Sequence, residues 1–153
     1  MSLLPLLRRA LAGEHVEGLP IEMPPPIART LGFDFATVDE GAAMCRLDVT
    51  RAAHANPMGT VHGGVLVTIA DAAMGMACLS LLSAGESFTT IELKANYFRP
   101  LVDGAVEARA RVVNAGRTLV YLECDVVAVG SEKLLAKSTS TCLVLRGEQA
   151  KGR

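Results

Sequence analysis

Asp71 is the residue whose position most clearly suggests chemistry, because it is the only charged side chain between Gly63 and Ser83. A helix formed from this apolar stretch would withdraw the carboxyl group from water, which raises its pKa unless a partner offsets the effect. Such groups are costly and tend to have a function. The alternative is a structural role, in which Asp71 pairs with a buried arginine or caps a neighbouring backbone.

A glycine-rich loop stands immediately before this helix, where Gly63 and Gly64 follow His62. The first N–H groups of a helix have no internal acceptor and carry the positive end of its dipole. Because glycine allows another molecule to approach the backbone closely, a carbonyl oxygen bound here would be polarised and its oxyanion stabilised. Asn56 adds an amide to the same loop. The alternative is an ordinary glycine-rich helix start, with His62 as its capping residue.

The two parts of this constellation are far apart in one chain. Asp71 lies about 12 Å along the helix from Gly63, which is too far for one reacting centre. Either the two residues serve separate purposes, or the helix of a second subunit brings its Asp71 to this Gly63. The second option predicts a symmetric homodimer with two shared active sites at its interface, and it gives an exposed sheet edge a partner.

The elements that must position these residues are one long helix and about six strands. We expect the helix to start at Gly63 and to end near Ser83-Ala84-Gly85, where the glycine suits a left-handed cap. Val-, Leu- and Thr-rich runs, several of which alternate in polarity, predict the strands, and short turns suggest antiparallel hairpins. The expected strands are two within 33–49, joined at Glu40-Gly41, followed by 88–97, 106–113, 118–129 and 134–145. The fold class is therefore α+β, with an antiparallel sheet curled around the central helix.

Alternation within 88–97 also assigns side chains to the two faces of that strand. It places Ile91 and Leu93 on one face, together with Ala95 and Tyr97. It places Thr90 on the opposite, polar face.

The chain divides into three parts. Residues 1–26 form an N-terminal arm that holds five of the seven prolines and starts with a short amphipathic helix. Residues 27–146 form the domain, and 147–153 form a polar tail.

Composition excludes several classes of protein. With 50% hydrophobic residues and a net charge of −1, the chain is neither disordered nor equipped with the basic stripe that nucleic-acid binding requires. A central Asp71 costs about 2.5–3.5 kcal/mol in a membrane, so the apolar helix is expected in a protein core and no membrane partner is expected. Four scattered cysteines without a CxxC pair indicate buried free thiols and a cytoplasmic protein.

The sequence resembles the hot-dog fold acyl-CoA thioesterases, in particular the PaaI-like branch of the phenylacetate-pathway and 4-hydroxybenzoyl-CoA thioesterase type. The resemblance covers roughly residues 27–145 and is carried by NPMGTVHGG and LVTIAD within 56–71. It continues through TTIELKANYFRP at 89–100, GRTL at 116–119 and STSTCLVL at 138–145.

The resemblance implies a role for each residue of the site. Gly63 would polarise the thioester carbonyl, Asn56 would orient the thioester or the attacking water, and His62 would support the loop beside the carbonyl. Asp71 of the partner subunit would be general base or nucleophile, and Thr90 would hold water beside it. Members form dimers of dimers, so a homotetramer is expected, and they need no metal or organic cofactor.

The expected reaction is hydrolysis of an acyl-CoA to free acid and CoA. The acyl group is aromatic, such as phenylacetyl or hydroxybenzoyl, or of medium chain length. Arg99 and Arg117 are the candidates for binding the CoA phosphates. Met58, Met74 and Phe88 are the candidates for the acyl pocket, although core packing is the more usual role for each methionine. The alternatives are an acyl-CoA binding protein or sensor without catalysis, and a hydratase or dehydratase on the same fold.

Overall fold

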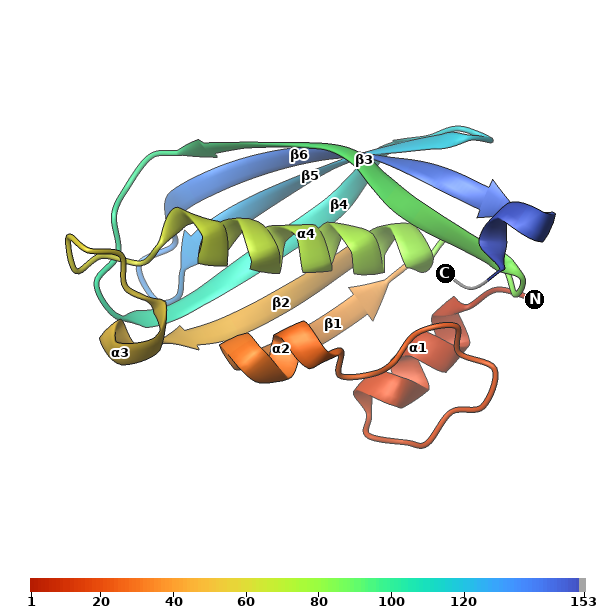
Figure 1. Cartoon of the computed structure of the whole chain (residues 1–153), viewed down its shortest axis with the longest axis horizontal. Coiled ribbons are helices and arrows are strands. Elements are labelled where there is room, and N and C mark those ends of the chain that lie inside the picture. Colours follow the sequence, from red (N-terminus) through yellow and green to blue (C-terminus); the bar gives the residue numbers. More distant parts are fainter. Residues whose placement is uncertain (152–153) are drawn as a thin grey trace.

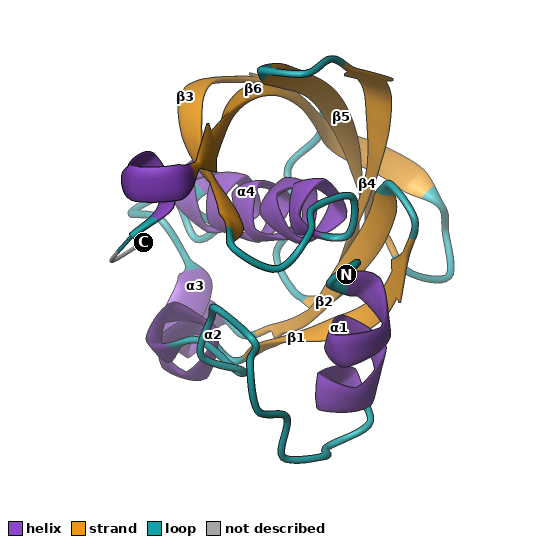
Figure 2. Ribbon diagram, turned by 90° about the vertical axis from the view of Figure 1, so that its right-hand side faces the viewer, coloured by secondary structure: helices purple, strands orange, loops and turns teal. Residues whose placement is uncertain are grey.

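A six-stranded antiparallel sheet curls around one long helix, α4, as the computed structural model of the chain shows (Figures 1 and 2). The structure describes residues 1–151. Its helices are α1 (Leu4–Leu11), α2 (Pro26–Leu31), α3 (Arg51–His54) and α4 (Gly63–Leu79), and a short 3-10 turn spans Gly147–Ala150. Its strands are β1 (Phe33–Asp39), β2 (Ala42–Val49), β3 (Glu86–Tyr97), β4 (Gly104–Ala115), β5 (Leu119–Ala128) and β6 (Lys133–Arg146).

The strands follow the order β1-β2-β4-β5-β6-β3, so β1 and β3 are the two edges. Side-chain alternation explains why the sheet has one face against α4 and one face in solvent. In β4, Val106, Ala108 and Ala110 are buried, whereas Arg109 and Arg111, which alternate with them, are exposed. The α+β prediction, with the sheet wrapped around a central helix, is confirmed.

Helix α4 ends earlier than the sequence suggested. It stops at Leu79, four residues before the expected cap at Ser83-Ala84-Gly85. The Ser80 hydroxyl, which is buried, donates to the carbonyl of Ala77 at 2.7 Å and accepts the N–H of Gly41 at 2.8 Å. Beyond it the chain pairs with the N-terminal segment, through a bridge between Ser2 and Ser83. Contacts from distant parts of the chain therefore decide where the helix ends.

Strand β3 contains a bulge that alternation alone did not reveal. Thr90 pairs with Cys142 and Glu92 pairs with Thr141, which leaves Ile91 as the extra residue. The face assignment made from alternation is therefore wrong on the N-terminal side of Ile91. Thr90 faces α4, as Leu93 does, and Ile91 points outward with 55% of its surface exposed.

The N-terminal arm packs along the β1 edge rather than extending into solvent. The amphipathic helix α1 forms as expected, and Leu3 and Leu7 of this region are completely buried in the core. The Arg8 side chain donates to the carbonyl of Val38 at 3.3 Å and to Asp39 at 2.6 Å, which anchors α1 to β1. Figures 1 and 2 place α1 and α2 across α4 from β3.

All four cysteines are buried and free, as the sequence indicated. Burial raises the pKa of the Cys124 thiol to about 12 and raises that of Cys45 further, so both stay protonated and unreactive at neutral pH. Within residues 1–151, no helix is long and apolar enough to cross a membrane.

Ser80 provides a test of how the end of α4 is held. Ser80→Ala removes a buried hydroxyl and leaves the Gly41 N–H without its acceptor, so we expect the free energy of unfolding to fall by about 1–3 kcal/mol. Urea unfolding of the two proteins measures the difference. Ser131→Ala, at an exposed turn, is the matched control and should change stability little; an equal effect of both substitutions would contradict the role of Ser80.

Candidate active site

Asp71 is half-buried on the face of α4 that looks toward β3. Burial raises the pKa of its carboxyl group, and a hydrogen bond from the Thr90 hydroxyl to Oδ1, 3.3 Å long, opposes this only in part. No Lys or Arg within residues 1–151 forms an ion pair with it. The structural alternative of a buried arginine partner is therefore absent from the described chain, and the carboxylate keeps its basicity.

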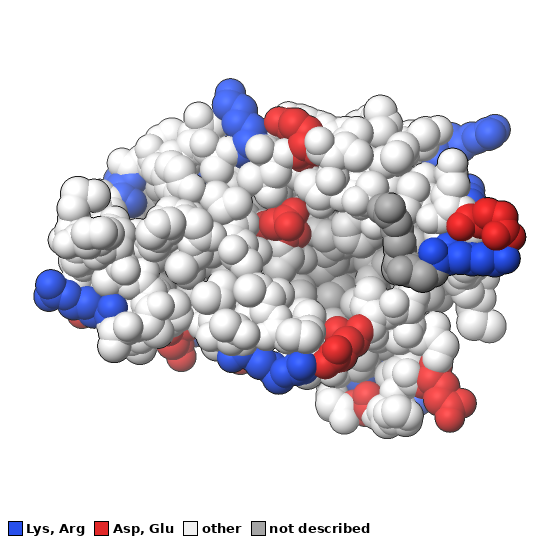
Figure 3. All heavy atoms as spheres, viewed as in Figure 1, with Lys and Arg blue, Asp and Glu red and all other residues white. Residues whose placement is uncertain are grey.

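Asp71 opens into a cleft of about 580 Å³ between α4, β3, β1 and the segment that precedes α2. The space-filling view shows this face as largely uncharged and hollowed along the helix (Figure 3). The cleft is lined by Ile21, Glu22, Met23, Pro25, Pro26, Ile27, Phe35, Thr68, Asp71, Ala72, Gly75, Met76, Leu79, Phe88 and Thr90. A mainly apolar cavity with one perturbed carboxylate is typical of a small-molecule site.

The start of α4 is built as the glycine-rich loop predicted. His62 is the N-cap, and its Nδ1 accepts the N–H of Gly64 at 2.9 Å. In the neutral ring Nε2 then carries the hydrogen and is free to donate. Within residues 1–151 the N–H of Gly63 forms no hydrogen bond, so it remains available to an external oxygen atom.

Tyr97 lies directly over Gly63. A Cβ atom added to Gly63 would stand 2.9 Å from the Tyr97 hydroxyl oxygen, so only glycine fits here without displacing the ring. Tyr97 belongs to β3, where alternation placed it on the same face as Leu93. No local pattern in the sequence indicated that it would cover Gly63, so sequence reasoning missed its place in the site.

Asn56 faces the same region but is already engaged in holding its loop. Its Nδ2 donates to the Thr60 hydroxyl at 2.9 Å, and its Oδ1 accepts the N–H groups of Met58 and Thr60 at 2.9 and 3.2 Å. One Nδ2 hydrogen remains for an external acceptor. Asn56, Gly63 and Tyr97 line a second cleft of about 410 Å³.

The predicted site residues therefore fall into two groups. Thr90 joins Asp71 in the first cleft, and Asn56 joins Gly63 in the second. In one chain the two groups do not meet, which agrees with the spacing along the helix.

The two cationic candidates are also separated. Arg99 lines the second cleft and donates to the Leu134 carbonyl at 2.9 Å, at the start of β6. Arg117 lies in the β4–β5 turn, where its carbonyl accepts from Arg146 at the end of β6. The two arginines thus stand at opposite ends of about 40 Å of strand, so one ligand on one chain cannot reach both.

Only one of the three acyl-pocket candidates lines the first cleft. Phe88 does, with its ring against Gly75, where an added Cβ would be 3.0 Å from the ring. Met74 is completely buried in the core, and Met58 is 84% exposed on the loop before α4. Met74 therefore packs in the core, which is the more usual role of a methionine, and Met58 does not line this cleft. Within residues 1–151, no three His, Cys, Asp or Glu side chains are grouped as a metal site requires.

Comparison with known proteins identifies the family, because residues 58–134 match the thioesterase superfamily. The chain belongs to the thioesterase superfamily. It is an enzyme, and its class of reaction is thioester hydrolysis.

One relative and two solved structures place it more closely. The chain is 30% identical over 118 residues to 1,4-dihydroxy-2-naphthoyl-CoA hydrolase of Listeria monocytogenes, covering 77% of this chain and 94% of that protein. It is 34% identical to the phenylacetic acid degradation protein PaaI of Thermus thermophilus, solved as a mutant, with a TM-score of 0.70 over 77% of this chain and 97% of that chain. A conserved protein of Pseudomonas aeruginosa is 34% identical, with a TM-score of 0.74 over 80% of this chain and 96% of that chain. The resemblance to PaaI-like hot-dog thioesterases is confirmed.

The raised pKa of Asp71 has a consequence for stability. Because folding raises this pKa, the ionised carboxylate destabilises the folded chain at neutral pH, and Asp71→Asn should therefore unfold at a higher temperature than the native protein. The difference should shrink as the pH falls through the raised pKa towards the ordinary value, since both side chains are then uncharged.

Thermal unfolding from neutral to mildly acid pH measures this difference. Asp34→Asn, at an exposed position, is the control and should show no comparable gain at neutral pH. A lower unfolding temperature for Asp71→Asn at neutral pH would show that the carboxylate is stabilised by a partner.

Proposed function

We propose that this thioesterase hydrolyses acyl-CoA, with Asp71 as the base or nucleophile and the Gly63 N–H as the group that polarises the thioester carbonyl. The observation that carries the proposal is the half-buried Asp71 carboxyl group, unpaired with any described cation and open to a largely apolar cleft. The CoA part of the proposal is supported by relatives whose names specify CoA thioesters, including the Listeria hydrolase and human acyl-coenzyme A thioesterase 13.

The separation of the two clefts supports a site shared between two subunits. Strand β3 is an edge of the sheet, so one side of its backbone has no partner within residues 1–151. Pairing with the same edge of a second chain would satisfy these groups. Such pairing would also bring the α4 helices of the two chains side by side, so that Asp71 of one protomer faces Gly63 of its partner. The homotetramer, the cytoplasmic location and the absence of a cofactor stay predictions.

The proposed reaction begins with the thioester carbonyl oxygen accepting the Gly63 N–H. As base, Asp71 removes a proton from water while the water oxygen attacks the carbonyl carbon, and the Gly63 N–H stabilises the oxyanion. Collapse of this intermediate breaks the carbon–sulfur bond and releases CoA thiolate and the free acid. As nucleophile, Asp71 would instead attack the carbonyl carbon to form a mixed anhydride, which water then hydrolyses.

The side chains around these two groups have supporting roles in the proposal. Thr90 donates to Oδ1 of Asp71 and so leaves Oδ2 free to contact water. His62 fixes the loop through its cap on Gly64, and Asn56 offers its remaining amide hydrogen in the Gly63 cleft. Arg99 borders that cleft and suits a CoA phosphate, whereas Arg117 could contribute only from a different chain. The acyl group is proposed to be aromatic or of medium chain length.

Loss of the Asp71 carboxylate should abolish most of the activity. We expect Asp71→Asn to lower kcat for phenylacetyl- and octanoyl-CoA by at least about 10²-fold, the usual effect of removing a positioned base. Thiol release measures the rate, and Asp34→Asn serves as the control with unchanged kcat. Equal rates for native protein and Asp71→Asn would remove Asp71 from the mechanism. A native protein that binds acyl-CoA without releasing thiol would support the alternative of a sensor.

Isotope tracing tests whether a covalent intermediate forms and is hydrolysed at the Asp71 carboxyl carbon. In a single turnover in ¹⁸O-water with enzyme in excess, we expect the label in the free acid and none in the Asp71 peptide, because Oδ2 is free to contact water. Mass spectrometry of the acid and of the digested protein measures both positions. Label in Asp71 would rule out simple base catalysis and assign it as the nucleophile.

A further inference from the structure

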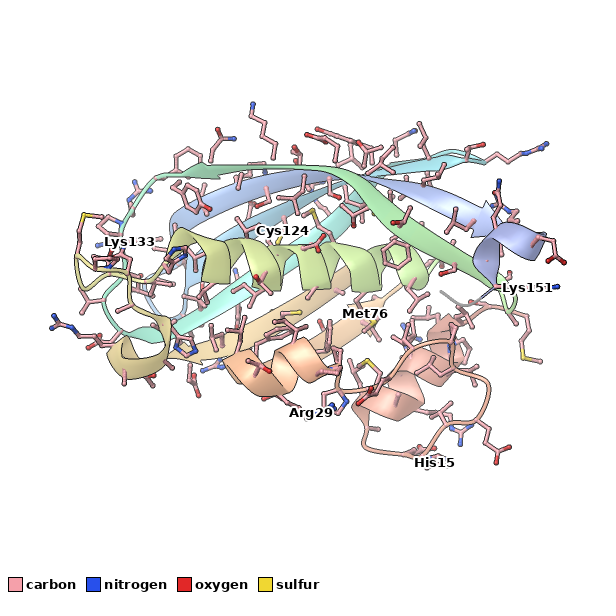
Figure 4. The ribbon with its side chains drawn as sticks, viewed as in Figure 1. His15, Arg29, Met76, Cys124, Lys133 and Lys151 are labelled. Atoms are coloured by element: carbon pink, nitrogen blue, oxygen red, sulfur yellow. The ribbon has the colours of Figure 1, made fainter. Side chains whose placement is uncertain are left out.

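One wall of the Asp71 cleft is built by the N-terminal arm. Residues 21–27, which we call the strap, contribute six of its lining residues, among them Ile21, Met23 and Ile27. Figure 1 shows the strap, between α1 and α2, passing beside the C-terminal half of α4, and Figure 4 shows Met76 of α4 facing this segment. The strap lies outside residues 58–134, which match the superfamily model.

The cleft is elongated along the helix. Its lining residues on α4 run from Thr68 to Leu79, and about 12 Å of helix separates Asp71 from Leu79. A thioester carbonyl held at Asp71 would therefore leave a long apolar groove for the rest of the acyl group. An acetyl group would fill only its beginning, whereas a medium-length chain would reach the strap.

The charges in the groove define what it can hold. Within residues 1–151, its only charged lining residues are Asp71 and Glu22, and both are acidic. A second carboxylate at the far end of an acyl chain would lose water and meet charge of its own sign. An uncharged apolar chain meets neither cost.

The strap is held in place by Arg29 of α2. Its guanidinium donates to the carbonyl of Pro24 at 2.5 Å and to Oε1 of Glu22 at 2.7 Å. Arg29 is exposed and does not line the cleft, and Figure 4 shows it beside the strap, away from α4. Its substitution can therefore loosen the strap without removing a side chain that lines the cleft.

We propose that the strap is the specificity wall of the acyl-binding site, and that it selects uncharged apolar acyl groups long enough to contact it. The inference rests on the proposed thioesterase site at Asp71 and adds the class of acyl group that the site prefers.

Three thioesters of matched design test this preference. Acetyl-, octanoyl- and suberyl-CoA differ in length or in a terminal carboxylate, and kcat/KM is measured for each. We expect the native protein to favour octanoyl-CoA over both others by at least about tenfold, the discrimination that an apolar pocket gives for a few methylene groups. Equal values for acetyl- and octanoyl-CoA, with Asp71-dependent hydrolysis of both, would overturn the strap proposal and leave the proposed function intact.

Two variants then assign the preference to the strap. Arg29→Met releases it, and Ile27→Asp places a charge on its half-exposed wall; each should reduce kcat/KM for octanoyl-CoA by about tenfold and change that for acetyl-CoA by less than about twofold. Arg9→Met is the control, because it breaks an equally exposed ion pair of the arm, with Glu14, outside the cleft. An unchanged octanoyl-to-acetyl ratio in both variants would overturn the proposal.

A binding measurement keeps the strap testable apart from catalysis. Titration calorimetry with the thioethers S-ethyl- and S-octyl-CoA, which cannot be hydrolysed, reports chain-length preference directly. If the native protein binds S-octyl-CoA more tightly and both Arg29→Met and Ile27→Asp lose this preference, the strap proposal is supported. This holds even if the native protein releases no thiol, because the absence of thiol release would overturn only the proposed function. Equal affinity of the native protein for both thioethers counts against the strap.

Discussion

The site depends on a carboxyl group that is partly withdrawn from water on an otherwise apolar helix. Burial on α4 raises the pKa of Asp71, and one long hydrogen bond from Thr90 offsets this desolvation only in part. The core supplies the stability that tolerates it, because most of the C-terminal half of α4 is buried by the curled sheet. Desolvation leaves a stronger base than a surface aspartate, placed where an apolar ligand can exclude water from it.

Two small irregularities give the site its shape. The bulge at Ile91 turns Thr90 toward α4, so that the hydroxyl reaches Asp71 although the residues that follow alternate in the opposite sense. At the other end of the same strand, Tyr97 covers Gly63 so closely that a side chain at Gly63 would displace its ring. A single edge strand thus contacts both halves of the site, and a change in its register would affect both together.

The N-terminal arm is held against the domain at two points. Leu3 and Leu7 are buried in the core and fix α1 there. Arg29 of α2 binds Glu22 and Pro24, so residues 21–27 are held along α4 rather than left in solvent. The superfamily match covers α4 and strands β3 to β5, which carry Gly63, Asp71 and Thr90. The groove beyond Asp71 is closed by residues 21–27, which lie outside that match.

The sequence by itself determined the α+β class, the six strands, the start of α4, and the positions of Gly63 and Asp71 on that helix. These follow from local periodicity, composition and glycine placement, which act over a few residues. Only the tertiary structure decided that α4 ends at Leu79, that a bulge redirects Thr90, and that Arg99 and Arg117 stand at opposite ends of β6. Each of these depends on which distant segments meet, as do the cover of Tyr97 over Gly63 and the strap beside α4. The spacing of residues along the chain does not predict such contacts, because they depend on how the sheet curls and on which segments pack against its concave face.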